Sequence, residues 1–155
     1  MHTTHLALAA IVLALLSLPS CALKPVTTEY DYISATTKDV RLDELGDGKV
    51  LIYNGSPRFS STRHERSNVW INGKGLGQLQ LREYVIVDLE EGDHQFEVHR
   101  HDGISALRIR QQEVTIDENT KVIRVAPVWI NVVQPIDELP RRFDRFTYAR
   151  NENIQ

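Results

Sequence analysis

The stretch that decides the fold runs from Val69 to Leu81 and reads VWINGKGLGQLQL. Its centre, Asn72-Gly73, is the strongest short hairpin signal, because both positions of a type I′ turn need a positive φ. The β-branched and aromatic run Val69 to Ile71 precedes the turn, and a second β-rich run, Gly75 to Leu81, follows it. The stretch therefore predicts two antiparallel strands joined by a two-residue turn.

Further β-rich runs lie on both sides of this hairpin and are separated by turn residues. They cover residues 49–54, 83–89, 94–100, 106–116 and 121–127, and residues 129–133 can extend the same sheet. The run 106–116 fits one long or bulged strand, or two short ones. Short strands at such close intervals predict an all-β sandwich or barrel.

Alternation along each run predicts which side chains are buried, since a one-residue slip would expose the whole apolar set. The predicted core consists of Val50, Ile52, Trp70, Val85, Val87, Leu89, Phe96, Val98, Leu107, Ile109, Val114, Ile116, Ile123 and Val125. Beyond Pro135 the spacing becomes helical, with Leu139, Phe143 and Phe146 on one stripe.

The N-terminus carries an apolar run, Leu6 to Leu18, interrupted only by Ser17, and no Asp, Glu, Lys or Arg occurs before Lys24. The run is too short to span a membrane comfortably, which takes about 20 apolar residues, and it fits the apolar part of a secretory signal peptide. A plain signal peptide with a chance cysteine and an uncleaved anchor are the alternatives.

The apolar run ends at Leu18-Pro19-Ser20-Cys21, which resembles the lipobox of bacterial lipoproteins. The resemblance implies cleavage between Ser20 and Cys21, a diacylglycerol thioether on Cys21 and acylation of the freed amine. Two or more acyl chains hold a protein firmly on a membrane, whereas one holds it only marginally. Ala22, in place of an aspartate after the cysteine, implies sorting to the outer membrane, with the domain facing the periplasm.

These features divide the chain into four parts. Residues 1–20 form the signal peptide, residues 21–46 a lipidated tether, residues 47–135 the β-sandwich, and residues 136–155 a short C-terminal helix and tail. The tether mixes Thr, Ser, Asp and Pro with scattered apolar residues, and Thr37 to Leu45 can form a short helix.

Charge and cysteine content narrow the function classes. The formal net charge of -3 gives no electrostatic reason to expect nucleic-acid binding. Because Cys21 is the only cysteine, its lipidation leaves no thiol for a disulfide or a cysteine-based metal site.

The segment Val69 to Asp102 resembles PEGA-type domains. Its Asn72-Gly73-Lys74 hairpin and the later Gly92 and His94 stand at the positions that such domains use. The wider arrangement, including Gly48-Lys49 before the first strand, is similar to a domain-of-unknown-function family of small bacterial lipoproteins. The resemblance implies a small transthyretin-like or immunoglobulin-like β-sandwich without an established activity.

Two sets of residues are candidate binding sites. Arginine forks suit phosphates and carboxylates, and Arg58, Arg63 and Arg66 form a basic loop with His64. Exposed aromatic rings, at Trp70, Trp129 or Tyr84, would suit a carbohydrate. A second basic set, Arg141, Arg142, Arg145 and Arg150, alternates with Phe143, Phe146 and Tyr148 and is interpreted as the solvated side of a packed helix.

The histidines raise a metal hypothesis and a structural alternative. His99 and His101 would share a strand face with Asp102 nearby, which could seed a site of two histidines and one carboxylate. His94 would fall on the other face, so we interpret the histidines as structural or surface residues and expect no metal, cofactor or catalytic residue. The leading hypothesis is a non-enzymatic envelope lipoprotein that binds a protein or cell-wall partner. The alternatives are a peptidoglycan- or carbohydrate-binding module and a metal-dependent hydrolase.

Overall fold

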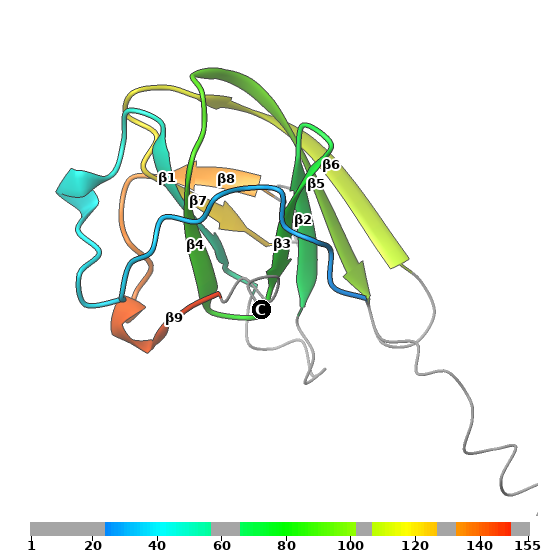
Figure 1. Ribbon diagram of the computed structural model, residues 1–155, viewed down its shortest axis with the longest axis horizontal. Helices are drawn as coiled ribbons and strands as arrows, with labels where there is room; N and C mark the ends of the chain where they lie inside the picture. The colour runs from blue at the N-terminus through cyan, green and yellow to red at the C-terminus, as the bar shows by residue number, and fades with distance from the viewer. Residues whose placement is uncertain (1–23, 57–65, 102–106, 127–132, 150–155) are drawn as a thin grey trace, which may run out of the picture.

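The computed structural model describes residues 24–56, 66–101, 107–126 and 133–149 and shows a two-sheet, all-β sandwich (Figure 1). Sheet A has the strand order β8 (Val133–Ile136), β7 (Val122–Val125), β1 (Lys49–Asn54), β4 (Glu83–Asp88) and β9 (Thr147–Tyr148). Sheet B has the order β3 (Lys74–Leu79), β2 (Ser67–Ile71), β5 (Gly92–His101) and β6 (Leu107–Ile116). The prediction of an all-β sandwich is confirmed.

The β2–β3 hairpin forms as the sequence predicts. Asn72 and Gly73 both take positive φ, at 52° and 77°, as a type I′ turn requires. The Asn72 side chain also holds the turn against β5, because its Oδ1 accepts the Gln95 amide at 2.8 Å. The run 106–116, for which the sequence allowed one long strand or two short ones, forms the single ten-residue strand β6.

The main core lies between the two sheets. It differs from the predicted core at two residues, Trp70 and Ile109. Val69 and Ile71 are fully buried, whereas Trp70 between them is only partly buried on the outer side of sheet B. Ile109 pairs with His99 on the same outer side and is 51% exposed. The side chain of Leu107 lies outside the described residues. The buried residues of this core are Val50, Ile52, Val69, Ile71, Leu76, Leu79, Val85, Val87, Leu89, Phe96, Val98, Val114, Ile116, Ile123, Val125, Val133 and Ala149.

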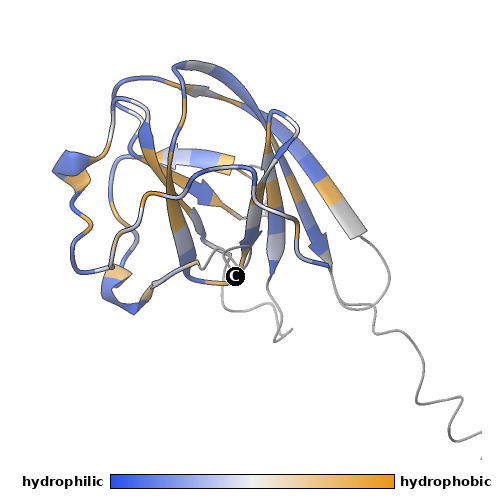
Figure 2. Ribbon diagram, in the orientation of Figure 1, coloured by the Kyte–Doolittle hydropathy of each residue, from blue (hydrophilic) through white to orange (hydrophobic). Residues whose placement is uncertain are grey.

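A second cluster covers the outer face of sheet A. Consecutive residues of β1 (50–53) and of β4 (84–87) are all buried, so both faces of these strands are covered. Figure 2 shows hydrophobic residues along the central part of β4. The covering side chains come from both ends of the chain; they are Ile33, Ala35, Val40, Leu42, Ile136, Leu139, Phe143, Phe146 and Tyr148. The sandwich therefore has a partial third layer.

The predicted C-terminal helix is wrong. Residues Phe143–Arg145 form a single 3-10 turn, η2, and Thr147–Tyr148 form strand β9 beside β4. Pro135 lies in β8, at the edge of sheet A, where a missing amide donor is tolerated. The apolar residues that suggested a helical stripe, Leu139, Phe143 and Phe146, pack in the second cluster instead. The Phe143 ring, for example, lies 5.0 Å from the ring of Tyr84.

The predicted tether also differs from the structure over residues 24–46. Residues 24–33, called here the strap, lie against the β3 side of the sandwich (Figure 1). Backbone and side-chain groups of the strap both hold it in place. The Ile33 amide donates to the carbonyl of Ile86 at 2.8 Å, and the Tyr30 hydroxyl donates to the carbonyl of Ile71 at 3.0 Å. The predicted helix from Thr37 to Leu45 is limited to a 3-10 turn, η1 (Leu42–Glu44). Residues 24–46 are therefore part of the folded domain.

Candidate binding face

The two outer faces of the sandwich differ. The outer face of sheet A is covered by the second cluster, whereas the outer face of sheet B is open to solvent over β5 and β6. The exposed side chains on this open face include Gln95, Ile109, Gln111, Glu113 and Thr115. We call this surface the Trp70 face, because Trp70 is its largest aromatic side chain.

An aromatic and polar group of side chains lies at the centre of the Trp70 face. The rings of Trp70 and His99 lie 4.2 Å apart at an angle of 43°. Nε2 of His99 contacts one carboxylate oxygen of Glu97, and Nε2 of Gln111 donates to the other at 2.6 Å. The stacked and hydrogen-bonded side chains come from β2, β5 and β6, so the sheet itself fixes the group.

The electrostatics of the group favour an ionised carboxylate. The hydrogen bond from Gln111, and then the one from His99, lower the pKa of Glu97 below its ordinary value of 4.5. Hydrogen bonds to the charged form of a carboxylate stabilise that form. Near neutral pH the face therefore presents a carboxylate held in place beside a half-buried indole.

An apolar position adjoins this group. His99 of β5 pairs with Asn68 of β2 on one side and with Ile109 of β6 on the other. Ile109 therefore lies next to the His99 ring on the outer side of sheet B. Ile109 is the exposed large hydrophobic residue of the described chain. An exposed apolar side chain, an aromatic ring and polar groups held by the sheet are suited to non-covalent binding, since aromatic residues are enriched at interfaces with partners.

The predicted site residues are only partly brought together. Arg66 is exposed immediately before β2, the strand that carries Trp70. Tyr84 is fully buried in sheet A and cannot take part in a carbohydrate groove with Trp70. Ser20, Cys21, Arg58, Arg63 and Trp129 lie outside the described residues.

Metal binding gains no support from the described side chains, among which no group of three His, Cys, Asp or Glu residues could hold an ion. His99 contacts Glu97, while the His101 side chain and Asp102 lie outside the described residues. His94 is buried: its Nε2 bonds to the carbonyl of Glu90 at 2.7 Å, and its Nδ1 bonds to the Asn72 amide nitrogen at 3.0 Å. These partners place the ring proton on Nε2, so His94 joins two turns of the fold.

Sequence reasoning missed Glu97, Gln111 and the exposure of Ile109. The sequence of β5 contains part of the signal that was missed. Because side chains alternate along a strand, Glu97 and His99 must lie on the other face of β5 from the apolar Phe96 and Val98. The place of Gln111 follows only from the β5–β6 register, in which Glu97 pairs with Gln111. That register is not readable from local sequence.

No helix in the described part of the chain is long and apolar enough to cross a membrane. Comparisons with protein-family models, with curated proteins and with solved structures find no match to this chain.

Proposed function

We propose that this chain is a non-catalytic lipoprotein of the bacterial cell envelope and that its Trp70 face binds an envelope partner. Lipid on Cys21 anchors the domain, at the outer membrane and facing the periplasm. The anchor is supported by the lipobox-like Leu18-Pro19-Ser20-Cys21 at the end of the apolar run. The binding role is supported by the difference between the two outer faces of the sandwich.

The observation that carries the binding role is the placement of Trp70 and Ile109 on an open sheet face. The chain covers the outer face of sheet A with its own N- and C-terminal segments, yet it leaves an indole and an isoleucine accessible on sheet B. A partner that covers this face would remove both side chains from water. Burial of apolar surface contributes about 25 cal/mol per Å² of area removed.

Anchoring is tested by fractionating cells that express the chain or a Cys21→Ala variant whose residues 1–20 are replaced by an ordinary cleavable signal peptide, so that the variant is still processed. We expect the unchanged protein in the membrane fraction and the processed variant in the soluble fraction. Full retention of the processed variant on membranes would exclude the lipid anchor.

Partner binding is tested by placing a photo-crosslinking residue at Gln111, on the Trp70 face, and at Asn119, in an exposed turn. We expect a defined adduct from position 111 only, and its loss when Trp70→Ala or Ile109→Ser is introduced. Thr147→Ala, at an exposed position of β9 in the other sheet, is the matched control. An adduct that forms equally from both positions, or that is unaffected by these substitutions, contradicts the assignment of this face.

A peptidoglycan-binding module is the second candidate, because the indole of Trp70 is only partly buried and an accessible aromatic ring can stack on a sugar ring. Sedimentation of the mature protein with purified cell-wall sacculi distinguishes the two functions. Binding to sacculi that is lost in Trp70→Ala would favour this alternative.

A further inference from the structure

Among the residues that the structure describes, the two ends of the sandwich carry opposite charge. One end, called here the acidic end, is formed by the start of β1, the end of β4, the start of β5 and the end of β6. Its acidic side chains are all exposed; they are Asp47, Asp88, Glu90, Glu91, Asp93, Glu113, Asp117 and Glu118. Lysines at this end, Lys49, Lys74 and Lys121, offset only part of that charge.

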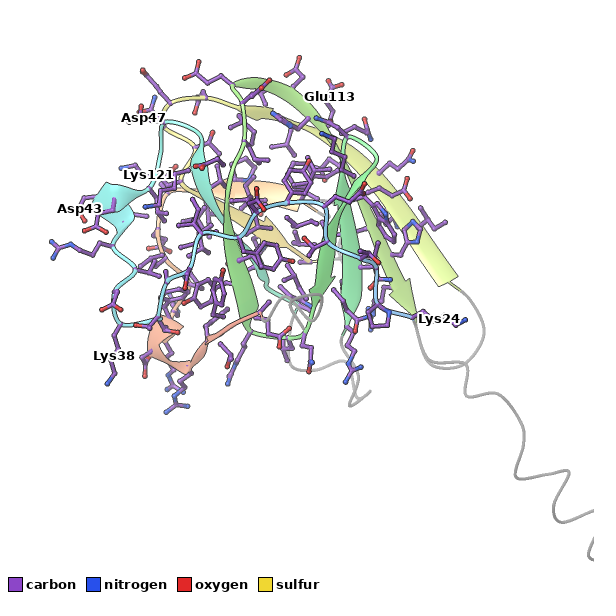
Figure 3. The ribbon with its side chains drawn as sticks, in the orientation of Figure 1. Lys24, Lys38, Asp43, Asp47, Glu113 and Lys121 are labelled. Carbon is purple, nitrogen blue, oxygen red and sulfur yellow. The ribbon has the colours of Figure 1, made fainter. Side chains whose placement is uncertain are left out.

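The opposite end, called here the basic end, contains the end of β3, the start of β4 and the end of β5. Lys24, Arg66, Arg82 and Arg100 lie there, with Glu83 as an acidic neighbour. Figure 3 shows Asp47 and Glu113 at the top of the molecule and Lys24 at the lower right. Strand β5 runs between the two ends with ten residues, so the ends are roughly 30 Å apart.

The strap brings the N-terminal side of the chain to the basic end. The carbonyl of Lys24 accepts a hydrogen bond from Nδ2 of Asn68 at 2.7 Å, one residue after the start of β2. Three peptide steps separate Cys21 from Lys24, and three steps span at most roughly 11 Å. A lipid on Cys21 would therefore enter the membrane close to the basic end.

We propose that the basic end faces the membrane and contacts anionic lipid headgroups, with the acidic end pointing away from the bilayer. This orientation rests on the lipid anchor of the proposed function. The Debye length at physiological salt is about 8 Å, so an acidic end roughly 30 Å away hardly feels the repulsion of the lipid surface. In the reverse orientation the acidic residues would meet that surface, and the anchor could not reach the bilayer.

The orientation also defines what the Trp70 face can reach. The strands of sheet B extend between the basic end and the acidic end. With the basic end on the membrane, the Trp70 face is therefore roughly perpendicular to the bilayer surface and does not lie on it. The face then remains available to a partner in the periplasm while the protein is anchored.

The experiment measures which end of the anchored protein is close to lipid. The lipidated mature protein is reconstituted into phosphatidylglycerol-containing vesicles, with phosphatidylcholine vesicles for comparison. Because lipid occupies the sulfur of Cys21, a new cysteine is the only reactive thiol. Gln80→Cys reports on the basic end and Asn119→Cys on the acidic end; both positions are exposed turn residues. Each carries a fluorophore, and the vesicles carry a headgroup-attached quencher.

We expect strong quenching at position 80 and little at position 119 in the anionic vesicles. Lys24→Glu combined with Arg66→Glu should reduce the quenching at position 80, since each basic residue near an anionic surface strengthens the association roughly fivefold. The matched control combines Lys74→Glu with Lys121→Glu, which changes the net charge equally at the other end and should have no effect.

Equal quenching at both positions, stronger quenching at position 119, or a result that does not depend on lipid charge would overturn the orientation. A mature protein that does not enter the vesicles would refute the lipid anchor, and the orientation falls with it. A protein that enters and shows equal quenching refutes the orientation alone.

Discussion

Substitution of Gly75 by alanine tests whether the strap is an integral part of the fold. An ideal Cβ at Gly75 would lie 2.2 Å from the carbonyl oxygen of Thr27 and 3.1 Å from Cγ2 of Val26. A real Cβ stays at least about 3 Å from such an atom, so Gly75→Ala forces the strap to move by roughly 1 Å.

The magnitude follows from the two hydrogen bonds that such a movement breaks. The Glu29 amide donates to the carbonyl of Gly75 at 2.7 Å, and the Gly75 amide donates to a carboxylate oxygen of Glu29 at 2.6 Å. A neutral hydrogen bond contributes about 1 kcal/mol to stability and one to a charged group about 1.5–3 kcal/mol. We therefore expect Gly75→Ala to lower the free energy of unfolding by about 2–4 kcal/mol.

The assay combines urea unfolding with limited proteolysis of residues 24–33. Gly75→Ala should lower the urea midpoint and accelerate cleavage within the strap. Lys74→Ala, at an exposed position of the same strand, is the control and should change stability by less than about 0.5 kcal/mol. An unchanged free energy of unfolding together with unchanged cleavage would refute the view that the strap packs as a structural element.

Three further predictions concern the core, the turns and the Trp70 face. Ile71→Ala should lower the free energy of unfolding by about 2–5 kcal/mol, whereas Ile109→Ala should change it by less than about 0.5 kcal/mol; similar values from urea unfolding would show that the face assignment is wrong. His94→Ala should cost about 1–3 kcal/mol in a thermal or urea unfolding experiment, because it leaves turn groups without partners; a neutral result would contradict that role. The pKa of Glu97 is lowered in the fold, so its stabilisation is present above pH 4.5 and is lost as the pH falls through the lowered value. Glu97→Gln should remove this part of the acid-dependent loss of stability, and an unchanged pH profile would contradict it.

The hairpin shows what local sequence could predict. Asn72 and Gly73 need no distant partner to favour positive φ, so their place between β2 and β3 was readable from two residues. The turn residues between the other β-rich runs are local signals of the same kind. Such local signals were enough to identify the all-β class.

The faces of the strands were harder to predict. Val69, Trp70 and Ile71 are all apolar, so a period of two cannot decide which of them is buried. The structure buries Val69 and Ile71, which lie beside Val98 and Phe96 of β5. The predicted set instead contained Trp70, which stacks on the outer side of the sheet.

Contacts between distant parts of the chain explain the remaining differences. Leu51 and Ile86 are buried because segments from both chain ends cover the outer face of sheet A. The unbroken apolar runs 50–53 and 84–87 are consistent with strands buried on both faces, but they do not show which segments supply the cover. The strap was interpreted as a tether because its sequence shows no strand pattern. Its contacts, such as those of the Ile33 amide with Ile86 and of the Tyr30 ring with the main core, join it to residues far along the chain. The Trp70 face was found only in part, since Gln111 joins Glu97 through strand register.

The most direct test of the central claim is the intact mass of the mature protein isolated from bacterial membranes. Our account predicts a chain that begins at Cys21 and carries the added mass of a diacylglycerol group and an amide-linked acyl chain. A mature chain with a free Cys21 thiol, or a precursor that retains residues 1–20 on the membrane, would contradict it.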